Sequence, residues 1–289
     1  MPVLVPTSLA DAVAAAGAAP DALLLAGGTD LMVEINERHR TLPWDDGSVI
    51  ALNRVPELSS WTLDRRAGSL RLGAAVRWAE LESEPLRDLV PALAEAARTV
   101  GSPQIRNAGT VGGNLATCSP AGDGLPVLAA YEATVDLIAA SGRRSMPVAE
   151  FMIGVKRTAI RPGELIESVT VPLLDGPQGY SKVGVRNAMV IATASACVAT
   201  DLPSRSVRIA LGSVAPTVIR VPDAELLVQS SVDWTARSLD PELAAAAGAM
   251  AAEASRPIDD HRSTAAYRRH AVSVMVRRQL LRAFRGGEA

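Results

Sequence analysis

Two glycine-rich segments carry the residue types in this chain that are best suited to chemistry. The first covers residues 23–31, with the sequence LLLAGGTDL, and the second covers residues 101–117, with the sequence GSPQIRNAGTVGGNLAT. Each segment places paired glycines beside hydroxyl side chains, just after an apolar stretch. Glycine lets a backbone approach a diphosphate closely enough to offer it N–H groups. Two such loops that converge on one ligand suggest a dinucleotide.

Neither segment matches the common nucleotide-binding motifs. The first has the layout of a phosphate loop, a strand followed by a glycine turn, but no Gly-Lys-Ser/Thr follows, so it is not a Walker loop. Neither segment reads Gly-x-Gly-x-x-Gly, the pattern of a Rossmann fold. The chain also shows no evident Ser-His-Asp set, metal site or acid–base pair. We therefore expect no catalytic side chain and no metal ligand.

The composition of the 289 residues excludes several classes of protein. Hydrophobic residues make up 48% and charged residues 21%, which is ordinary for a globular protein. The formal net charge of -2 offers no broad basic surface to nucleic acid. No apolar run approaches a membrane span, and the N-terminus lacks the features of a secretory signal. We expect a cytoplasmic protein with no nucleic-acid partner and no integral membrane contact.

The two cysteines, Cys118 and Cys197, are too few for a metal cluster built by this chain alone. An iron–sulfur cluster usually needs four thiolates, and a structural zinc needs four closely spaced Cys or His ligands. The three histidines share no such spacing. We expect both cysteines to be small buried residues.

The apolar pattern predicts helices and strands in two domains, the second of which suits a small α+β domain. A helix is expected at 8–16, with Ser8 as its N-cap and Gly17 as its stop. Another helix is expected at 90–100, and strands at 22–26, 48–53, 69–74, 134–139 and 165–173. The sequence LDGPQG at 174–179 marks the boundary between domains at 1–174 and 179–286. Three strands (180–185, 191–199, 206–214) and three helices (222–229, 241–255, 263–285) follow it.

The last predicted helix is rich in arginine. Its apolar stripe contains Tyr267, Ala271, Val274, Leu281 and Phe284. The arginines fall largely elsewhere, at Arg268, Arg269, Arg277, Arg278, Arg282 and Arg285. The favoured interpretation is an amphipathic helix with a solvated basic face. The alternative is a face that meets an acidic partner subunit.

At the glycine segments the chain resembles a known family. The residues AGGTD at 26–30 and QIRNxGTVGGN at 104–114 resemble the FAD-binding medium subunit of molybdenum hydroxylases, of the carbon monoxide dehydrogenase and xanthine dehydrogenase type. The residues KVGxR at 182–186 and PIDDxRxxxxYRRH at 257–270 resemble the family's small C-terminal domain. The resemblance therefore covers nearly the whole chain, in matching order and spacing.

The resemblance implies both a fold and a function. The fold is a two-subdomain FAD-binding fold of the vanillyl-alcohol oxidase type, not a Rossmann fold, with subdomains at about 1–55 and 56–174. A small α+β domain with a three-stranded sheet and helices follows. The chain would be the flavoprotein subunit of an oxidoreductase, taking electrons from a small 2Fe–2S subunit and passing them to an external acceptor. A large molybdopterin subunit would complete a heterohexamer, a dimer of heterotrimers. The shortage of cysteines fits this division.

The resemblance also implies roles for particular residues. The pyrophosphate of FAD would meet main-chain N–H groups of four glycines and the hydroxyls of two threonines, namely Gly27, Gly28, Gly112, Gly113, Thr29 and Thr110. Asn114 and Thr117 would make further polar contacts. Thr117 could equally be a strand residue that makes only packing contacts. The remaining positions implied at the cofactor are Leu25, Ala26, Leu31, Val100, Gly101, Val111 and Ile166, and core packing explains Val100 and Ile166 as well.

Three charged residues have competing interpretations. Asp123 would accept a hydrogen bond from a ribose hydroxyl, or would cap a helix at 125–130. Asp30 is similarly placed and would brace the turn at Gly27 and Gly28. Lys182 would lie near the flavin ring, where a cation raises the reduction potential, or would be a solvated strand lysine.

Two other functions stay open at this point. A free-standing FAD oxidoreductase acting on a small molecule would need a proton donor or base beside the flavin, and no convincing candidate is present. A cofactor-free assembly module would keep the fold and lose the cofactor. The intact glycine pairs and both threonines argue against that alternative.

Overall fold

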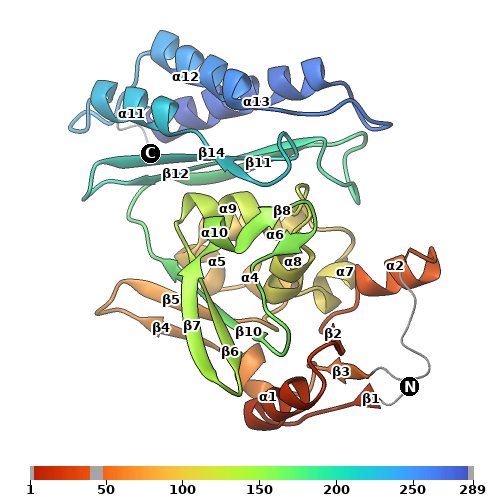
Figure 1. Ribbon diagram of the computed structural model, residues 1–289. Helices are drawn as coiled ribbons and strands as arrows, with labels where there is room; N and C mark the ends of the chain where they lie inside the picture. The colour runs from red at the N-terminus through yellow and green to blue at the C-terminus, as the bar shows by residue number, and fades with distance from the viewer. Residues whose placement is uncertain (1–2, 40–47, 286–289) are drawn as a thin grey trace.

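The computed structural model describes residues 3–39 and 48–285. The predicted domain limits at residues 1 and 286 lie outside the described residues. Figure 1 shows two stacked parts. The elements up to β10 (Leu165–Pro172) form the lower part, and those from β11 (Gln178–Val183) onward form the upper part.

A three-stranded parallel sheet lies at the start of the chain. Its strand order is β1-β3-β2, with bounds Val3–Leu4, Val49–Ala51 and Leu23–Leu25. β2 runs directly into the first glycine turn, as the pattern predicts. Helix α2 (Leu31–Asn36) follows that turn. The first glycine segment therefore connects the end of a parallel strand to a helix.

Helix α1 (Leu9–Ala18) begins where the sequence predicts and ends later. The hydroxyl of Ser8 accepts the N–H of Asp11, which confirms Ser8 as the N-cap. Gly17 does not stop the helix, which continues through Ala18. A Cβ on Gly17 would lie 3.4 Å from the Cβ of Ala140, so this glycine is a packing residue on the side of the helix.

A five-stranded antiparallel sheet forms the centre of the lower part. Its order is β4-β5-β10-β6-β7. The bounds of the other four strands are Trp61–Asp64 for β4, Ser69–Gly73 for β5, Thr134–Ala139 for β6 and Gly142–Pro147 for β7. Helices surround it, namely α3 (Pro56–Ser59), α4 (Trp78–Leu81), α5 (Leu86–Leu89), α6 (Pro91–Thr99), α9 (Gly124–Ala130) and α10 (Val148–Phe151). The hairpin of β8 (Met152–Gly154) and β9 (Arg157–Thr158) completes this part.

The second glycine segment forms two short helices, which corrects the expectation of an open loop. Helix α7 (Pro103–Ala108) starts at Ser102, and helix α8 (Val111–Thr117) starts at Thr110. Both caps accept the N–H three residues ahead, and Pro103 provides the fixed φ that favours the first helical position. These local caps outweigh the low helix propensity of the glycines.

The C-terminal sheet has four antiparallel strands rather than the three expected. Its order is β11-β12-β13-β14, and the bounds are Ala194–Asp201 for β12, Ser206–Gly212 for β13 and Ile219–Arg220 for β14. β14 is too short to show an alternating pattern, because Pro222 begins helix α11 two residues after it. Helices α11 (Pro222–Ser231), α12 (Pro241–Ala254) and α13 (Ala265–Ala283) cover one face of this sheet, as seen in Figure 1.

The other face of the C-terminal sheet packs on the lower part. Helix α6 contacts β11, and helix α9 contacts β12 and β13. Successive residues of β12 therefore enter two different hydrophobic cores. Ala196 and Val198 face α11–α13, whereas Cys197 and Ala199 join the core of the lower part. Small side chains on that second face let the two parts come close together.

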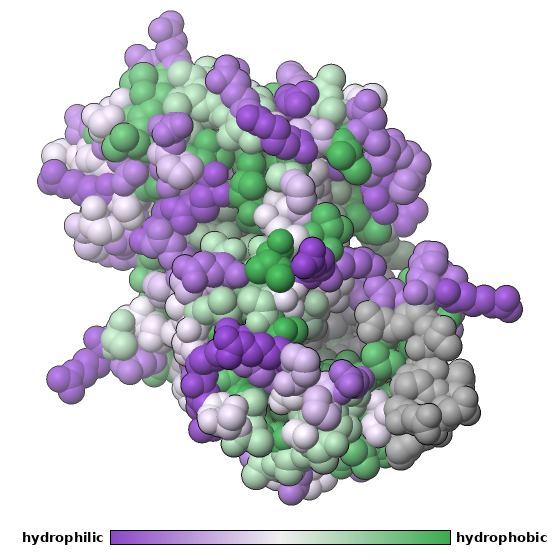
Figure 2. All heavy atoms as spheres, viewed as in Figure 1, coloured by the Kyte–Doolittle hydropathy of each residue, from purple (hydrophilic) through white to green (hydrophobic). Residues whose placement is uncertain are grey.

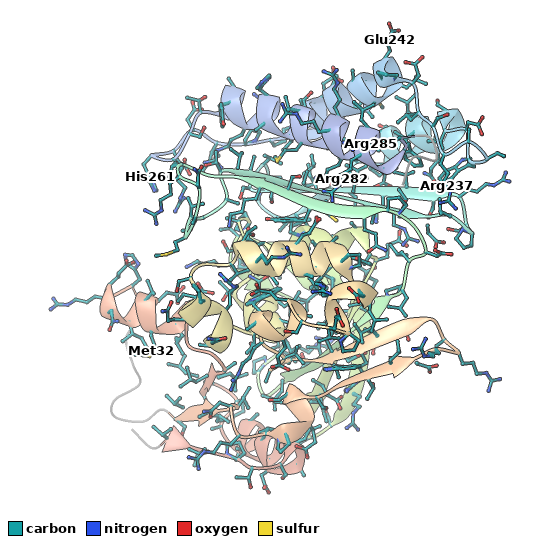
Figure 3. All side chains as sticks on the ribbon, turned by 180° about the vertical axis from the view of Figure 1, so that it is seen from behind. Met32, Arg237, Glu242, His261, Arg282 and Arg285 are labelled. Atoms are coloured by element: carbon teal, nitrogen blue, oxygen red, sulfur yellow. The ribbon has the colours of Figure 1, made fainter. Side chains whose placement is uncertain are left out.

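Helix α13 buries only part of the expected stripe, because Ala271 and Phe284 are buried but Tyr267 is not. Tyr267 is 47% exposed, whereas Arg268 is buried together with Val272 and Val276. The expectation of a solvated Arg268 was wrong, because the helix turns this side chain toward polar groups inside the upper part. Arg282 and Arg285 lie near the C-terminal end of the helix, as Figure 3 shows from behind.

The structure confirms the expectation for the two cysteines. Cys118 and Cys197 are free and buried. In residues 3–39 and 48–285 no helix has the length and apolar character needed to cross a membrane. No group of three or more His, Cys, Asp or Glu side chains in the same ranges could hold a metal ion.

The core position of Leu93 on α6 gives a test of the packing. Leu93 is fully buried in the core of the lower part. We expect Leu93→Ala to lower the free energy of unfolding by about 2–5 kcal/mol, because it leaves a cavity. The matched control is Leu226→Ala, since Leu226 on α11 is 67% exposed and its loss is expected to change stability by less than about 0.5 kcal/mol. Urea unfolding compares them, and equal shifts would contradict this packing.

Candidate functional site

Both glycine segments line one cavity of about 510 Å³. Its size falls within the range of roughly 300–1,000 Å³ that is usual for ligand pockets. All the cofactor-site residues predicted from the sequence line it, except Val111 and Lys182. Figure 2 shows the recess on this face of the molecule, between the upper part and the region of α2.

The two glycine segments meet through their backbones. A Cβ on Gly27 would overlap the carbonyl oxygen of Ala108, so only glycine permits this approach. The hydroxyl of Thr117 donates a hydrogen bond of 3.0 Å to Asp30. Asp30 therefore braces one segment against the other, whereas the role expected for it was to brace the turn at Gly27 and Gly28.

The first segment presents a run of unused backbone donors. Within the described residues, the N–H groups of Gly27, Gly28, Thr29 and Asp30 donate no hydrogen bond. All four residues line the cavity. Gly28 has a φ of +71°, a conformation that glycine adopts without strain. Consecutive backbone N–H groups in such a turn form a concave site for an anion.

The second segment uses its first N–H groups to hold its own position. The N–H of Gly112 donates to the carbonyl of Ala74 at 2.8 Å, and that of Gly113 donates to the hydroxyl of Thr110 at 3.0 Å. A Cβ on Gly112 would lie 2.6 Å from that of Ala74. Gly112 is therefore required for contact with the end of β5. Val111 is fully buried in the core and does not reach the cavity.

Asn114 leaves a buried polar atom without a partner. It lines the cavity from helix α8, and its Oδ1 makes no hydrogen bond with any described residue. Buried polar atoms in proteins are generally paired. An orphaned amide oxygen in the cavity wall is typical of a site that receives a ligand with hydrogen-bond donors.

A buried ionic cluster forms the wall nearest the C-terminal part. Lys182 donates to Asp123 at 2.8 Å and to the carbonyl of Thr99 at 2.9 Å. The hydroxyl of Tyr180 donates to the other oxygen of Asp123 at 2.7 Å. The side chains of Lys182 and Asp123 are only 6% and 9% exposed, so the solvated lysine considered from the sequence is excluded. Lys182 acts at the cavity only through Asp123.

The environment of Asp123 moves its pKa in two directions. Burial raises the pKa of Asp123, whereas the Lys182 ammonium and the Tyr180 hydroxyl act to lower it. Burial also raises the pKa of Tyr180 well above its ordinary value, so this phenol keeps its proton. Asp123 occupies the N-cap position of α9 but makes no side-chain cap. Its carboxyl is held by the other two residues of the cluster instead.

Several cavity residues were missed from the sequence. The mouth carries an ion pair of 2.6 Å between Glu34 on α2 and Lys156 in the β8–β9 turn, two residues that are distant in the chain. Residues 189–191 line the cavity from the upper part, because β12 begins at Ala194 and not at residue 191. The apolar run at 189–191 follows Asn187, a turn-forming residue, which is the signal for a loop there.

An apolar region accompanies these polar groups. Aliphatic side chains that line the cavity include Leu24 on β2, Leu52 after β3, Leu58 on α3, Ile160 before β10 and Ile166 on β10. Val100 and Gly101 line the cavity where α6 ends. The cavity therefore combines an apolar wall with a line of hydrogen-bond donors, as expected for a ligand with ring systems and an anionic centre.

Comparison with known proteins identifies the family. Residues 1–174 match the family described as the FAD binding domain in molybdopterin dehydrogenase. The chain belongs to this family. Residues 180–283 match the carbon monoxide dehydrogenase flavoprotein C-terminal domain. The expected FAD-binding fold, which is not a Rossmann fold, and the expected C-terminal α+β part are confirmed, and FAD is the cofactor of the family.

Individual relatives extend over most of the chain. It is 31% identical to the carbon monoxide dehydrogenase medium chain of Hydrogenophaga pseudoflava over 282 residues, 95% of this chain and 94% of that one. It is also 31% identical to the glyceraldehyde dehydrogenase medium chain of Sulfolobus acidocaldarius over 255 residues, 87% and 86% of the two chains. The structure of the H. pseudoflava enzyme lacking the Mo-pyranopterin moiety of its molybdenum cofactor matches with a TM-score of 0.86 and 30% identity, covering 98% of this chain and 96% of that one.

The ionic cluster of this flavoprotein can be tested by a double-mutant cycle. Asp123→Asn leaves the Lys182 ammonium buried without its carboxylate. Lys182→Met leaves the Asp123 carboxylate buried without its ammonium. We expect each change to lower the free energy of unfolding by about 3–5 kcal/mol. The double variant is expected to lose less than the sum, because no unpaired charge remains.

Urea unfolding measures all three variants. Lys156→Met is the control, since its ion pair with Glu34 is more exposed and is expected to be worth about 1 kcal/mol or less. Additive losses from Asp123→Asn and Lys182→Met would show that the two side chains are not coupled.

Proposed function

We propose that this chain is the electron-transfer subunit of a molybdenum hydroxylase and holds FAD in the cavity between its glycine segments. The observation that carries the proposal is the run of unused backbone donors at Gly27, Gly28, Thr29 and Asp30 in the cavity wall. These N–H groups would hold the pyrophosphate. Thr110, whose hydroxyl caps α8, also lines the cavity and would add a polar contact.

The charges that line the cavity determine which of its groups would hold an anion. Among the described lining residues, the charged ones are Asp30, Glu34, Asp123 and Lys156. Three acidic residues and one lysine give this set a formal net negative charge, so an anion would be held by the backbone donors. Carboxylates suit hydroxyl donors, so Asp123 would accept a hydrogen bond from a ribose or ribityl hydroxyl. The Asn114 amide oxygen would accept a second bond on the same side.

The chain would contribute binding, orientation and electrostatics. When bound, FAD supplies the chemistry of accepting and releasing electrons. Lys182 and Tyr180 would hold Asp123 in one orientation toward the cavity. Because Lys182 is already paired, its charge would reach the cofactor only as part of a neutral pair.

The partners follow from the family and from what this chain lacks. We propose a small 2Fe–2S subunit as electron donor and a large molybdopterin subunit as the hydroxylating centre. The relatives named as medium chains of dehydrogenases support this division. A dimer of heterotrimers in the cytoplasm, a heterohexamer, is part of the proposal. So are domains at 1–174 and 179–286, with subdomains at about 1–55 and 56–174.

An absorption spectrum of the purified chain tests the function. We expect about one FAD per chain, released by heat, without the broad absorption of iron–sulfur clusters. A colourless protein that cannot be reconstituted with FAD, even with its partner chains, would instead favour a cofactor-free assembly module. Turnover of a small molecule by the isolated chain would favour a free-standing oxidoreductase.

Two glycines offer a sharper test of the cofactor site. We expect Gly28→Val and Gly113→Val to abolish stoichiometric FAD binding. Valine is strained at the φ of Gly28, and a Cβ at Gly113 would lie 2.9 Å from the Thr110 hydroxyl. Flavin content and the melting temperature are measured together. The matched control is Gly154→Ala, whose Cβ would meet nothing closer than 3.8 Å. Full flavin content in both valine variants would place the site elsewhere.

A further inference from the structure

Arg268 is a buried arginine with two kinds of partner. Its guanidinium donates to the carbonyls of Thr193 at 2.8 Å and Ser213 at 3.0 Å, and to the carboxylate of Asp260 at 2.6 Å. Its side chain is only 5% exposed. The planar fork of arginine reaches several acceptors in fixed directions, which an ammonium group cannot do. One side chain on α13 therefore holds three separate segments.

The first of these segments leads to the cavity. Residues 184–193 connect β11 to β12, and the N–H of Thr193 donates to the carbonyl of Val183, which closes the base of this loop. Residues 189–191 of the loop line the cavity. The loop folds back on itself, because a Cβ on Gly184 would lie only 2.5 Å from the Val190 side chain. Arg268 thus holds the end of a loop that forms part of the cavity wall.

The second segment links that loop to the lower part of the molecule. Ser213 follows β13 with a φ of +62°, an uncommon conformation for a residue with a side chain. Its N–H donates to the carbonyl of Pro120 at 2.8 Å, and its hydroxyl donates to the carbonyl of Ala192 at 2.9 Å. Ser119 and Ala121, on either side of Pro120, line the cavity. By holding the Ser213 carbonyl, Arg268 stabilises the contact between two cavity-lining segments.

The third partner keeps the guanidinium in place. Asp260 accepts the N–H groups of Arg262 and Ser263 as well as Arg268. Burial opposes its ionisation, but these hydrogen bonds lower the pKa of Asp260 to about 2. The carboxylate is therefore charged at neutral pH. It fixes one end of the guanidinium while the other end faces the two carbonyls.

We propose that Arg268 is a positioning residue for the FAD site. It acts through Thr193 and Ser213 to fix the loop at 184–193 as a wall of the cavity. The inference rests on the proposed function, because the wall matters for FAD only if FAD occupies this cavity. Arg268 itself does not line the cavity and is not placed in contact with the cofactor.

The test compares Arg268→Met with Arg269→Met in the full-length chain. Arg269 is the next residue on the helix, is exposed, and has no hydrogen bond or ion pair within the described residues. We expect Arg268→Met to weaken FAD binding by about tenfold to a hundredfold, the usual range for losing hydrogen bonds from a charged group. Titration of the FAD-free chain with FAD, followed by flavin fluorescence, gives the dissociation constant. Arg269→Met is expected to bind like the wild type.

A second readout needs no cofactor. Amide hydrogen exchange of the FAD-free chain is expected to be about tenfold faster at residues 184–193 in Arg268→Met, while the β4–β7 sheet is unchanged. Arg268→Lys keeps a positive charge toward Asp260 but lacks the several directed N–H donors of the guanidinium. Its exchange rate at residues 184–193 and its FAD affinity are therefore expected to lie between those of the wild type and Arg268→Met. If the methionine variant does not fold, Arg268→Lys and Asp260→Asn provide the same comparison, with weaker effects.

The outcomes separate this inference from the proposed function. A wild-type chain that binds no FAD, alone or with its partners, overturns the proposed function. A wild type that binds FAD, together with Arg268→Met of equal affinity and unchanged exchange at 184–193, overturns only the role of Arg268. Faster exchange across the whole upper part, with unchanged FAD affinity, would also contradict the proposal, because it would reveal a purely structural residue.

Discussion

The close approach of Gly27 to the carbonyl of Ala108 is the contact on which the rest of the site depends. It joins two segments that are about eighty residues apart, one at the end of a parallel strand and one between two short helices. No side chain can occupy that gap, so the two backbones define the width of the cavity between them. The hydrogen bond from Thr117 to Asp30 fixes the same spacing a few residues away. The donors at 27–30 make no hydrogen bond and belong to cavity-lining residues, whereas the N–H groups of Gly112 and Gly113 are satisfied within the protein.

The C-terminal sheet extends this arrangement across the whole molecule. One face of the sheet packs on α11–α13, and the other packs on α6 and α9 through small residues such as Cys197 and Ala199. Tyr180 and Lys182 lie on β11 and reach Asp123 from that sheet. The cavity is therefore complete only when both parts are docked. This chain carries both parts, with residues 1–174 and 180–283 matching the two family descriptions.

The sequence predicts what depends on local pattern and misses what depends on distant partners. The alternation of apolar and polar residues located β6 and β10. The N-cap at Ser8 and the glycine turn after β2 were recognisable from residue type. The helices within 101–117 were missed, because glycine pairs obscure a helix whose caps decide its formation. The burial of Arg268 was also missed. The helix sequence alone does not indicate whether an arginine will find buried acceptors. Those acceptors come from residues 193, 213 and 260, which lie elsewhere in the chain.

The distribution of charge indicates how such a site discriminates among ligands. Each lysine at the cavity is paired with a carboxylate, Lys182 with Asp123 and Lys156 with Glu34. The wall therefore offers directional hydrogen bonds and little net attraction for anions. In the proposed site, a ligand with a single diphosphate would satisfy the donors at 27–30, whereas an additional phosphate would meet carboxylates and, among the described lining residues, only the paired Lys156. Because backbone donors cannot move independently, selectivity of this kind depends on the spacing of the two segments. We therefore propose that the glycines, rather than any charged side chain, determine what this cavity accepts.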